Sequence, residues 1–227
     1  MIKTTQHGEH LWQVTRQGWC NCYLVAEPDG LTLIDTNFIG ASGAIRDAAQ
    51  ALGMPIVRIC LTHAHSDHAG SLDKLVAGLP EAEVCFGARE ARFMRGDRVL
   101  LDGEPKKMLK AMVKLRTRPS RELLPGDRIG SLEVFAAPGH TPGQIAFLDT
   151  RDRSLIAGDS FTSIAGLYVT SQINPRFPFP TLATWDRPTA LASAVALTSL
   201  KPSRLALGHG RVVEPAAAAM VSATARG

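Results

Sequence analysis

The sequence predicts an α+β protein with the layers of an αββα sandwich: two mixed β-sheets packed face to face, with helices on both outer faces. Two observations lead to this prediction. Runs that are typical of strands come in two batches, and segments with the apolar spacing of helices lie between and after them. The chain has 227 residues and no internal repeat, linker or low-complexity segment. Because this length can enclose a substantial core, residues 1–227 are expected to form a single domain.

Strands and helices are expected to alternate in the first half of the chain. Two apolar runs around a Pro-Asp-Gly turn predict a pair of strands, and the runs IVRICL and AEVCF predict two more. Ser42 is a candidate cap for a helix that Gly53 and Pro55 end. The expected elements are strands at 20–28, 30–37, 56–61 and 82–86, and helices at 42–52, 68–79 and 88–95.

The second half begins with a basic segment and continues with strands. In EPKKMLKAMVKLRTRP, lysines alternate with apolar residues as in an amphipathic helix. The segment NPRFPFP is expected to be a loop, because three prolines in seven residues exclude a helix or a central strand. The expected elements are a helix over 104–119, strands within 127–161, a helix over 185–200 with Pro188 in its first turn, a strand at 204–210 and a helix at 214–223.

The basic residues are unevenly distributed. One stretch contains seven of them and no acidic residue: Lys106, Lys107, Lys110, Lys114, Arg116, Arg118 and Arg121. Subtracting these seven charges from the formal net charge of +4 leaves −3 on the rest of the chain. A net negative remainder disfavours a general nucleic-acid-binding surface, so a small molecule is the expected partner and nucleic acid is not.

A cytoplasmic location is expected, without a membrane partner. The first 19 residues contain neither a continuous apolar stretch nor a small-residue cleavage site, and the longest apolar runs are too short to span a membrane. Cys20, Cys22, Cys60 and Cys85 have no C-x-x-C spacing, and cytosolic thiols usually stay reduced. All four are expected to be small residues in or near the core.

Three of the seven histidines stand close together in THAHSDHAG, directly after the apolar run IVRICL. Neutral imidazole and carboxylate groups are good zinc ligands. His63 and His65 alternate and can converge on one ion, whereas Asp67 and His68 are adjacent at an expected helix start and can converge on a second. The alternative is a polar network in the core, but core histidines do not cluster in this way. The spacing H-x-H-x-D-H therefore predicts a metal site.

Each ion needs further ligands, and three candidates follow strand-like runs elsewhere in the chain. They are His140 in APGHTPG, Asp159 in IAGDSF and His209 in ALGHG. In each case an apolar run ends, a glycine allows tight backbone geometry, and the candidate ligand follows. His7 and His10 fall outside this pattern and are assigned to a polar N-terminal strand or tail.

The ordered motifs THAHSDHAG, GHTPG, GDS and GHG resemble those of the metallo-β-lactamase superfamily, from about Asp35 to His209. The resemblance implies that His63, His65 and His140 bind one metal, that Asp67, His68 and His209 bind a second, and that Asp159 bridges the two. At LIDTN the family commonly has glycine after the threonine; Asn37 stands there and also tolerates left-handed backbone. Asp35 is expected to hydrogen-bond near the ligand loops and not to bind metal.

Such a centre predicts hydrolysis. Two ions per chain, zinc by preference with iron or manganese as alternatives, would share a hydroxide and polarise the bond that it attacks. Asp67 is the candidate catalytic residue, because it could orient that hydroxide and help to move its proton. The predicted function is a dinuclear zinc-dependent hydrolase of a small carbonyl substrate, which is an ester, a lactone or a thioester.

Several branches of the family remain open as alternatives. Asp159 weighs against a β-lactamase, since true β-lactamases of this family generally have cysteine or serine there and are exported. Glyoxalase II-like thioesterases add a C-terminal helical region, whereas about 18 residues follow His209 here. Lactonases commonly have a tyrosine where this chain has Thr162. A nuclease or phosphodiesterase fits the basic segment, and a mononuclear iron sulfur dioxygenase uses a similar scaffold.

Two segments are candidates for the substrate pocket. NPRFPFP carries Phe177 and Phe179, which could form an apolar wall or equally pack inward as an ordinary surface loop. The basic segment could place Met108 and Met112 over the substrate as a lid. The alternative for that segment is a solvated amphipathic helix on the core.

Overall fold

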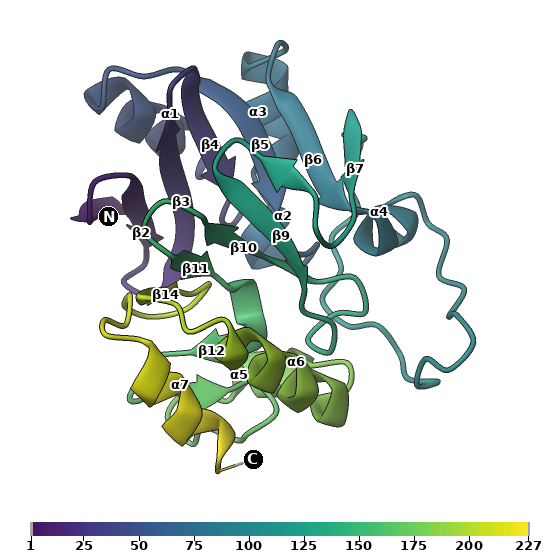
Figure 1. The fold of residues 1–227 in the computed structure, drawn as a ribbon. Helices are drawn as coiled ribbons and strands as arrows, with labels where there is room; N and C mark the ends of the chain where they lie inside the picture. Colours follow the sequence, from purple (N-terminus) through teal and green to yellow (C-terminus); the bar gives the residue numbers. More distant parts are fainter. Residues whose placement is uncertain (1, 227) are drawn as a thin grey trace.

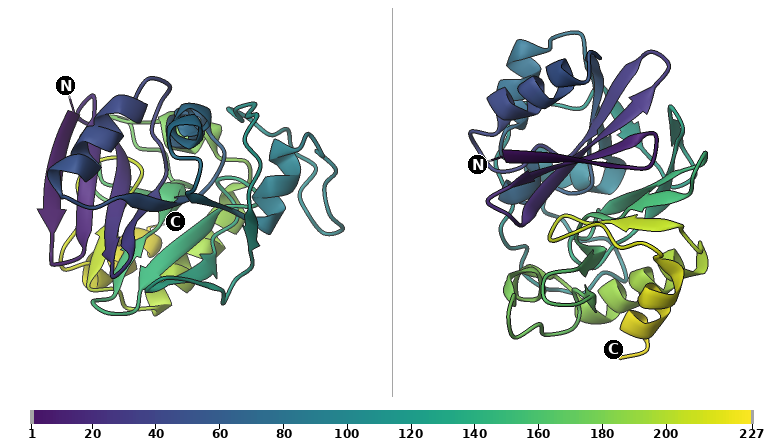
Figure 2. Two further views of the ribbon diagram at one scale, coloured as in Figure 1. Left: turned by 90° about the horizontal axis from the view of Figure 1, so that it is seen from above. Right: turned by 90° about the vertical axis from the view of Figure 1, so that its left-hand side faces the viewer.

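Two β-sheets lie face to face in the computed structural model, which describes residues 2–226 (Figure 1). Helices α1 (Ser42–Ala51) and α3 (Leu72–Gly78) cover the outer face of one sheet. Helices α6 (Arg187–Ser199) and α7 (Ala217–Thr224) cover the outer face of the other. Figure 2 shows these four layers from two further sides. The α+β class and the αββα sandwich expected from the sequence are confirmed.

The first sheet has seven strands that follow one another in chain order. Its first four strands are antiparallel and the last four are parallel, with β4 belonging to both groups. The strands are β1 (Ile2–His7), β2 (Leu11–Arg16), β3 (Cys20–Glu27), β4 (Gly30–Ile34), β5 (Ile56–Leu61), β6 (Glu83–Gly87) and β7 (Arg121–Leu123). Carboxyl ends of parallel strands meet at one edge, so the loops after β4 and β5 lie side by side there.

The second sheet has five strands in the order β14-β11-β10-β9-β8. Only the pair β11 and β14 is parallel, so this sheet is also mixed. The strands are β8 (Arg128–Ile129), β9 (Leu132–Ala136), β10 (Ile145–Asp149), β11 (Ser154–Ile156) and β14 (Arg204–Ala206). A separate two-stranded ribbon, β12 (Phe161–Thr162) and β13 (Tyr168–Val169), follows the short helix η1 (Gly158–Ser160).

Alternation along the strands creates the apolar layers that hold the sandwich together. In β10, Ile145 and Phe147 belong to the layer between the two sheets, whereas Ala146 and Leu148 belong to the layer under α6 and α7. A third layer joins the first sheet to α1 and α3. A strand that is apolar at every position is thus buried on both faces, which explains why the strand-like runs of this sequence are nearly continuous.

The helix expected over residues 68–79 is divided into two helices, α2 (Ser66–Ala69) and α3. The break lies at Gly70, where a side chain would collide with the carbonyl oxygen of Ser66 and the backbone nitrogen of Ile39. The chain after β4 therefore approaches this turn too closely for any residue but glycine. The result is a short helix that carries Asp67 and is held against the end of β4.

Two other details differ from expectation. Ser42 is a residue of α1 and makes no capping bond; the N–H of Ala41 instead donates to Oγ of Ser71, 2.8 Å away. The loop expected over residues 174–180 ends early, because α5 (Phe179–Ala183) begins inside it.

The remaining helix of the first half, α4 (Ala88–Met94), agrees with expectation. The described part of the chain has no helix that is long and apolar enough to cross a membrane.

The prediction of an amphipathic helix over the basic segment is wrong. Residues 104–119 contain no helix. The N–H of Val113 donates to the carbonyl of Ala64 (3.0 Å), and the N–H of Ser66 donates to the carbonyl of Ala111 (3.3 Å). The segment thus runs along the loop that carries the histidine cluster. Pairing with that loop satisfies backbone groups that a helix would have satisfied internally, and tertiary structure overrides the helical spacing.

Candidate metal centre

The structure brings together the seven side chains that the sequence singles out. They come from the loop after β5, from α2, from the loop between β9 and β10, from η1 and from the loop after β14. Six of them are at most 3% exposed, whereas the side chain of Asp67 is 20% exposed. The seven are His63, His65, Asp67, His68, His140, Asp159 and His209.

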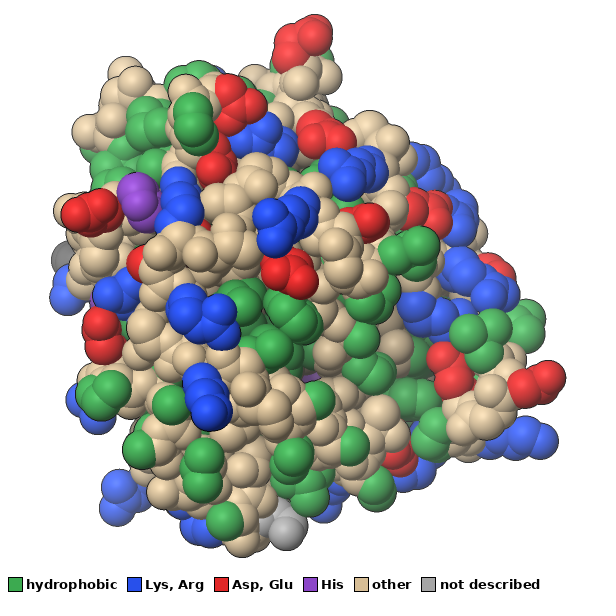
Figure 3. Space-filling view, viewed as in Figure 1, with side chains coloured by type: hydrophobic (Ala, Val, Ile, Leu, Met, Phe, Trp, Pro, Cys, Tyr) green, Lys and Arg blue, Asp and Glu red, His purple; other side chains and the backbone are tan. Residues whose placement is uncertain are grey.

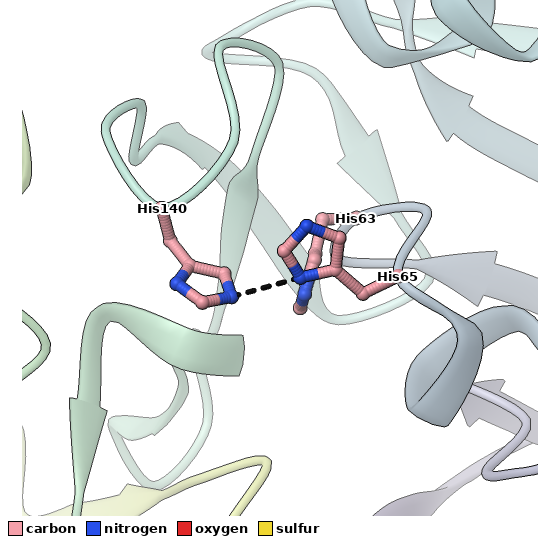
Figure 4. Close-up of side chains that lie close together, drawn as sticks. All are labelled: His63, His65 and His140. Carbon is pink, nitrogen blue, oxygen red and sulfur yellow. Dashed lines mark hydrogen bonds between the residues drawn. The ribbon is translucent and has the colours of Figure 1, made fainter. Parts of the chain in front are cut away.

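Three histidines form the first group of donor atoms (Figure 4). The ring nitrogens of His63, His65 and His140 lie within 4.8 Å of one another. Nε2 of His140 is 3.0 Å from Nδ1 of His65. Burial lowers the pKa of all three rings, to about 3 for His65 and about 4 for His140. The rings are therefore neutral at neutral pH, which is the form that binds metal.

Asp159 lies between this group and a second one. Its Oδ2 is 3.3 Å from Nε2 of His140 and 3.0 Å from Nε2 of His209, and its Oδ1 is 3.3 Å from Nε2 of His68. Oδ2 of Asp67 completes the second group at 3.3 Å from Nε2 of His209. One carboxylate thus faces ligand candidates of both groups, which is the position that a bridging ligand would need.

The donor set fits a pair of cations. Six buried side-chain polar atoms have no hydrogen-bond partner among the described residues, and three of them are candidate donor atoms of this centre: Nε2 of His63, Nε2 of His68 and Oδ1 of Asp159. Orphaned atoms of this kind are costly unless another group satisfies them. Although burial lowers the pKa of His209, Asp159 and Asp67 raise it to about 9. A cation that replaced the proton on His209 would pair with the same two carboxylates, those of Asp159 and Asp67.

Asp35 supports the second group from the end of β4. Its carboxylate accepts hydrogen bonds from the N–H and Oγ1 of Thr62, both at 2.8 Å, and lies 2.7 Å from Nδ1 of His68. The Asp35 side chain therefore fixes which nitrogen of His68 points into the centre. Asp35 and Asn37 have φ values of 63° and 59°, and Asn37 accordingly has the left-handed backbone for which the family uses glycine.

Glu90 in α4 supports the first group and was not predicted from the sequence. Its carboxylate is 1% exposed and accepts hydrogen bonds from the N–H of Ala64 (2.7 Å) and from Oγ1 of Thr141 (3.0 Å). Ala64 stands between His63 and His65, and Thr141 follows His140. One side chain therefore joins the two loops that supply the three histidines. No local pattern distinguishes it from other glutamates in helices.

Cys20 lies beside the second group and is not merely a core residue. All four cysteines are buried, as expected. However, Sγ of Cys20 lies within 4.8 Å of donor atoms of both Asp67 and His209, and it donates to the backbone carbonyl of Asp67 at 3.3 Å. Burial and the nearby carboxylates raise the pKa of this thiol far above its usual range. No local pattern indicates this proximity, because Cys20 begins the distant strand β3.

Aromatic side chains line a cavity of about 250 Å³ at the centre. Phe177 and Phe179 contribute to its wall, as do Trp19 and Phe38, which were not predicted from the sequence. The ring of Trp19 is 5.4 Å from that of Phe177 and 5.3 Å from that of His209, centroid to centroid. Apart from the ligand candidates the lining is mainly apolar, which suits a small organic substrate.

The two methionines of the basic segment do not line this cavity. Met108 is 79% exposed, and Met112 packs partly buried against the layer under α1 and α3. Ala111, between them, lines the cavity instead. The segment therefore reaches the centre through its backbone and a small side chain, because it pairs with the loop of the histidine cluster.

Comparisons with known proteins agree with this architecture. The family model of the metallo-beta-lactamase superfamily matches residues 16–209. The chain is 43% identical over 215 residues to the uncharacterized protein YobT of Bacillus subtilis, with 92% of each chain covered. It is 27% identical to YflN of the same organism, a probable metallo-hydrolase, over 82% of this chain and 78% of that one.

A crystal structure of the protein TTHA1623 in a di-iron-bound form is similar as well. The superposition has a TM-score of 0.67 and 27% sequence identity, and it covers 90% of this chain and 94% of the other. The family match spans more than half of the chain and includes every motif of the centre described above. The chain belongs to the metallo-beta-lactamase superfamily and is a metal-dependent hydrolase of that fold.

Proposed function

We propose that this enzyme hydrolyses a small carbonyl substrate, an ester, a lactone or a thioester, at a centre of two metal ions. His63, His65 and His140 would hold one ion, Asp67, His68 and His209 the other, and Asp159 would bridge them. The observation that carries this proposal is the position of Asp159 between the two donor groups, with separations of 3.0–3.3 Å to histidines of both.

Bound metal ions would supply Lewis acidity and lower the pKa of a water molecule. The protein's own contribution centres on Asp67, the one ligand candidate whose side chain is 20% exposed. It lines the cavity, so its carboxylate can hold a water molecule in line with a bound carbonyl and pass the proton to solvent. The wall formed by Trp19, Phe38 and Phe177 excludes bulk water from the acyl group.

Zinc is the proposed metal, since imidazole and carboxylate ligands suit it. Iron and manganese remain alternatives, and the di-iron form of TTHA1623 supports iron in particular. A centre of seven donors also disfavours the mononuclear iron dioxygenase, which would leave part of the set unused.

Charge disfavours the nuclease alternative. Within the basic segment, Lys107 pairs with Asp186 at 2.7 Å and Arg116 lies 3.8 Å from Asp73, so acids of other elements neutralise part of it. On the face drawn in Figure 3, blue and red side chains are interspersed around a central apolar area. A polyanion needs a continuous basic track, and that face does not provide one.

Metal analysis and a substrate panel test this function together. Protein purified without added metal or chelator should contain two ions per chain and should turn over a chromogenic ester, a lactone or a thioester faster than a β-lactam or a phosphodiester. Asp159→Ala should lose metal and activity. Asp149→Ala is the matched control, because Asp149 at the end of β10 is also buried but pairs with Arg151, away from the centre. One iron per chain with oxygen consumption on a persulfide, or faster phosphodiester cleavage, would refute the proposal.

A further inference from the structure

A second, larger cavity lies beside the metal centre. It has a volume of about 830 Å³ and is bounded on one side by the β1–β2 hairpin and on the other by residues 163–166, Arg176 and residues 210–211. Alternate residues of β1, Lys3, Thr5 and His7, line it. This face of the hairpin is open because the second sheet is narrower: its edge strand β14 leads to His209, which bridges to Cys20 of β3, and β1 at the outer edge is left exposed or half-buried.

We refer to this cavity as the basic groove. Three exposed cations, Lys3, Arg176 and Arg211, line it together with His7, and no acidic residue does. Within residues 2–226, none of these three side chains forms an ion pair, although many other basic side chains of the protein do. Cations that surround a concavity without counter-charges create a positive potential that attracts small anions.

The floor of the basic groove is fixed by hydrogen bonds. The carbonyl of Gly210 accepts from Nε2 of Gln13 (2.8 Å) and from Nδ2 of Asn21 (2.7 Å), and Nε2 of His7 lies 3.0 Å from Oε1 of Gln13. Gly210 has a φ of +97°, and a side chain there would collide with Oγ of Ser163. The hairpin and the loop after β14 thus hold the shape of the groove in the free protein. A ligand would therefore bind without the free-energy cost of ordering these segments.

A wall one residue thick separates the basic groove from the metal cavity. Three pairs of consecutive residues span this wall, and in each pair one residue lines the groove and its neighbour lines the metal cavity. The pairs are Gly18 and Trp19, Arg176 and Phe177, and Gly210 and His209. The wall is exposed at its rim, where Arg176 stands at the groove and Phe179 (66% exposed) stands at the metal cavity, so a ligand that passes over residues 176–179 can contact both cavities.

We propose that the basic groove binds the anionic end, a carboxylate or a phosphate, of the same small molecule whose carbonyl is hydrolysed at the metal centre. This inference rests on the proposed function. The substrate class is then an ester or thioester whose acidic group lies on a tail long enough to reach the neighbouring groove from the scissile carbonyl. Three cations around one concavity match one or two anionic groups rather than the long backbone of a nucleic acid.

The test compares two variants of the full metal-loaded enzyme. The groove variant is Lys3→Gln/Arg176→Gln/Arg211→Gln. The control variant is Lys74→Gln/Arg98→Gln/Lys106→Gln, which removes the same charge from exposed side chains outside both cavities. Circular dichroism and thermal melting establish that both are folded.

Binding is measured first, without turnover, by calorimetry with inorganic phosphate, pyrophosphate and succinate at low and moderate salt. The wild type and the control variant should bind at least one of these anions, and the groove variant should bind it about tenfold more weakly or worse. The phosphate and carboxylate probes identify which anion is preferred. Equal binding by all three proteins would overturn the inference, whatever the enzyme hydrolyses.

Kinetics then use two thioesters with the same acyl group and tails of equal length, one neutral and one ending in the preferred anion. The groove variant should lose about tenfold in kcat/KM on the anionic thioester, mainly through KM, and keep its rate on the neutral one. Equal loss on both substrates, or no preference for the anionic tail in the wild type, contradicts the inference but leaves the hydrolase intact. Salt-sensitive binding of single-stranded oligonucleotide that only the groove variant loses would assign the groove to nucleic acid. If no carbonyl substrate is turned over, the proposed function fails, and with it the assignment of the bound anion to a substrate.

Discussion

Glu90 offers a sharp test of how the fold supports the first metal group. Its carboxylate accepts from the N–H of Ala64 (2.7 Å) and from Oγ1 of Thr141 (3.0 Å), and so ties the His63–His65 loop to the His140 loop. Glu90→Ala would leave both donors buried without a partner. Each such orphan costs about 1–3 kcal/mol, so we expect the two to lower the free energy of unfolding by roughly 2–6 kcal/mol.

Glu90→Gln should be much milder. Burial raises the pKa of Glu90 to about 7, although the hydrogen bonds that it accepts lower it, so the carboxyl group is close to half-protonated at neutral pH. An amide has the same shape as the protonated acid and keeps an acceptor for the Ala64 N–H. We expect a loss of about 1 kcal/mol in stability and largely retained metal.

The assay measures metal affinity and stability separately. Chelator competition should show that Glu90→Ala weakens binding of one ion by about 10- to 100-fold, as expected when a residue that orients ligands is removed. Glu27→Ala is the matched control. Glu27 is also buried and accepts from the N–H and Oγ of Ser131 (3.0 and 2.6 Å), but it lies away from the centre. If Glu90→Ala loses stability like this control and keeps its metal affinity, Glu90 is only structural and the reasoning is refuted.

Asp159, His209 and the two methionines of the basic segment can be tested in the same way. Asp159→Asn should retain the fold but lower the content of both metals, since an amide has one acceptor oxygen to offer and the two donor groups each need one. Full metal occupancy of this variant in elemental analysis would show that Asp159 is not the bridging ligand. Metal binding should tighten as pH rises towards about 9 and should release protons, because Asp159 and Asp67 raise the pKa of His209 to about 9 and a proton on that ring competes with the cation. Calorimetry in buffers of different ionisation enthalpy measures the number of protons released. A metal affinity that does not change between pH 7 and 9 would contradict this prediction. Met112→Ala should lower the melting temperature more than Met108→Ala, since only Met112 packs against the core. Equal decreases in melting temperature would contradict this and would show that the Met108 side chain also makes stabilising contacts.

Local patterns in the sequence determined the layers of the fold and most of the centre. Strands that are buried on both faces appear as continuous apolar runs, and α6 begins where Asp186 accepts from the N–H of Thr189 and Pro188 fits the first turn. The ligand candidates were predictable because they follow the ends of such strands, and because His63, His65, Asp67 and His68 are close in the chain as well as in space.

Tertiary structure alone decided what surrounds that centre. Trp19 reaches it from the turn before β3, Cys20 from β3 and Glu90 from α4. Nothing in their own segments signals a role, because the contacts form only when distant elements pack. The basic segment has the spacing of a helix, yet residues 111 and 113 pair with the loop of the histidine cluster. Helical spacing is a weak local preference, and backbone hydrogen bonds to a neighbouring loop outweigh it once that loop is in place.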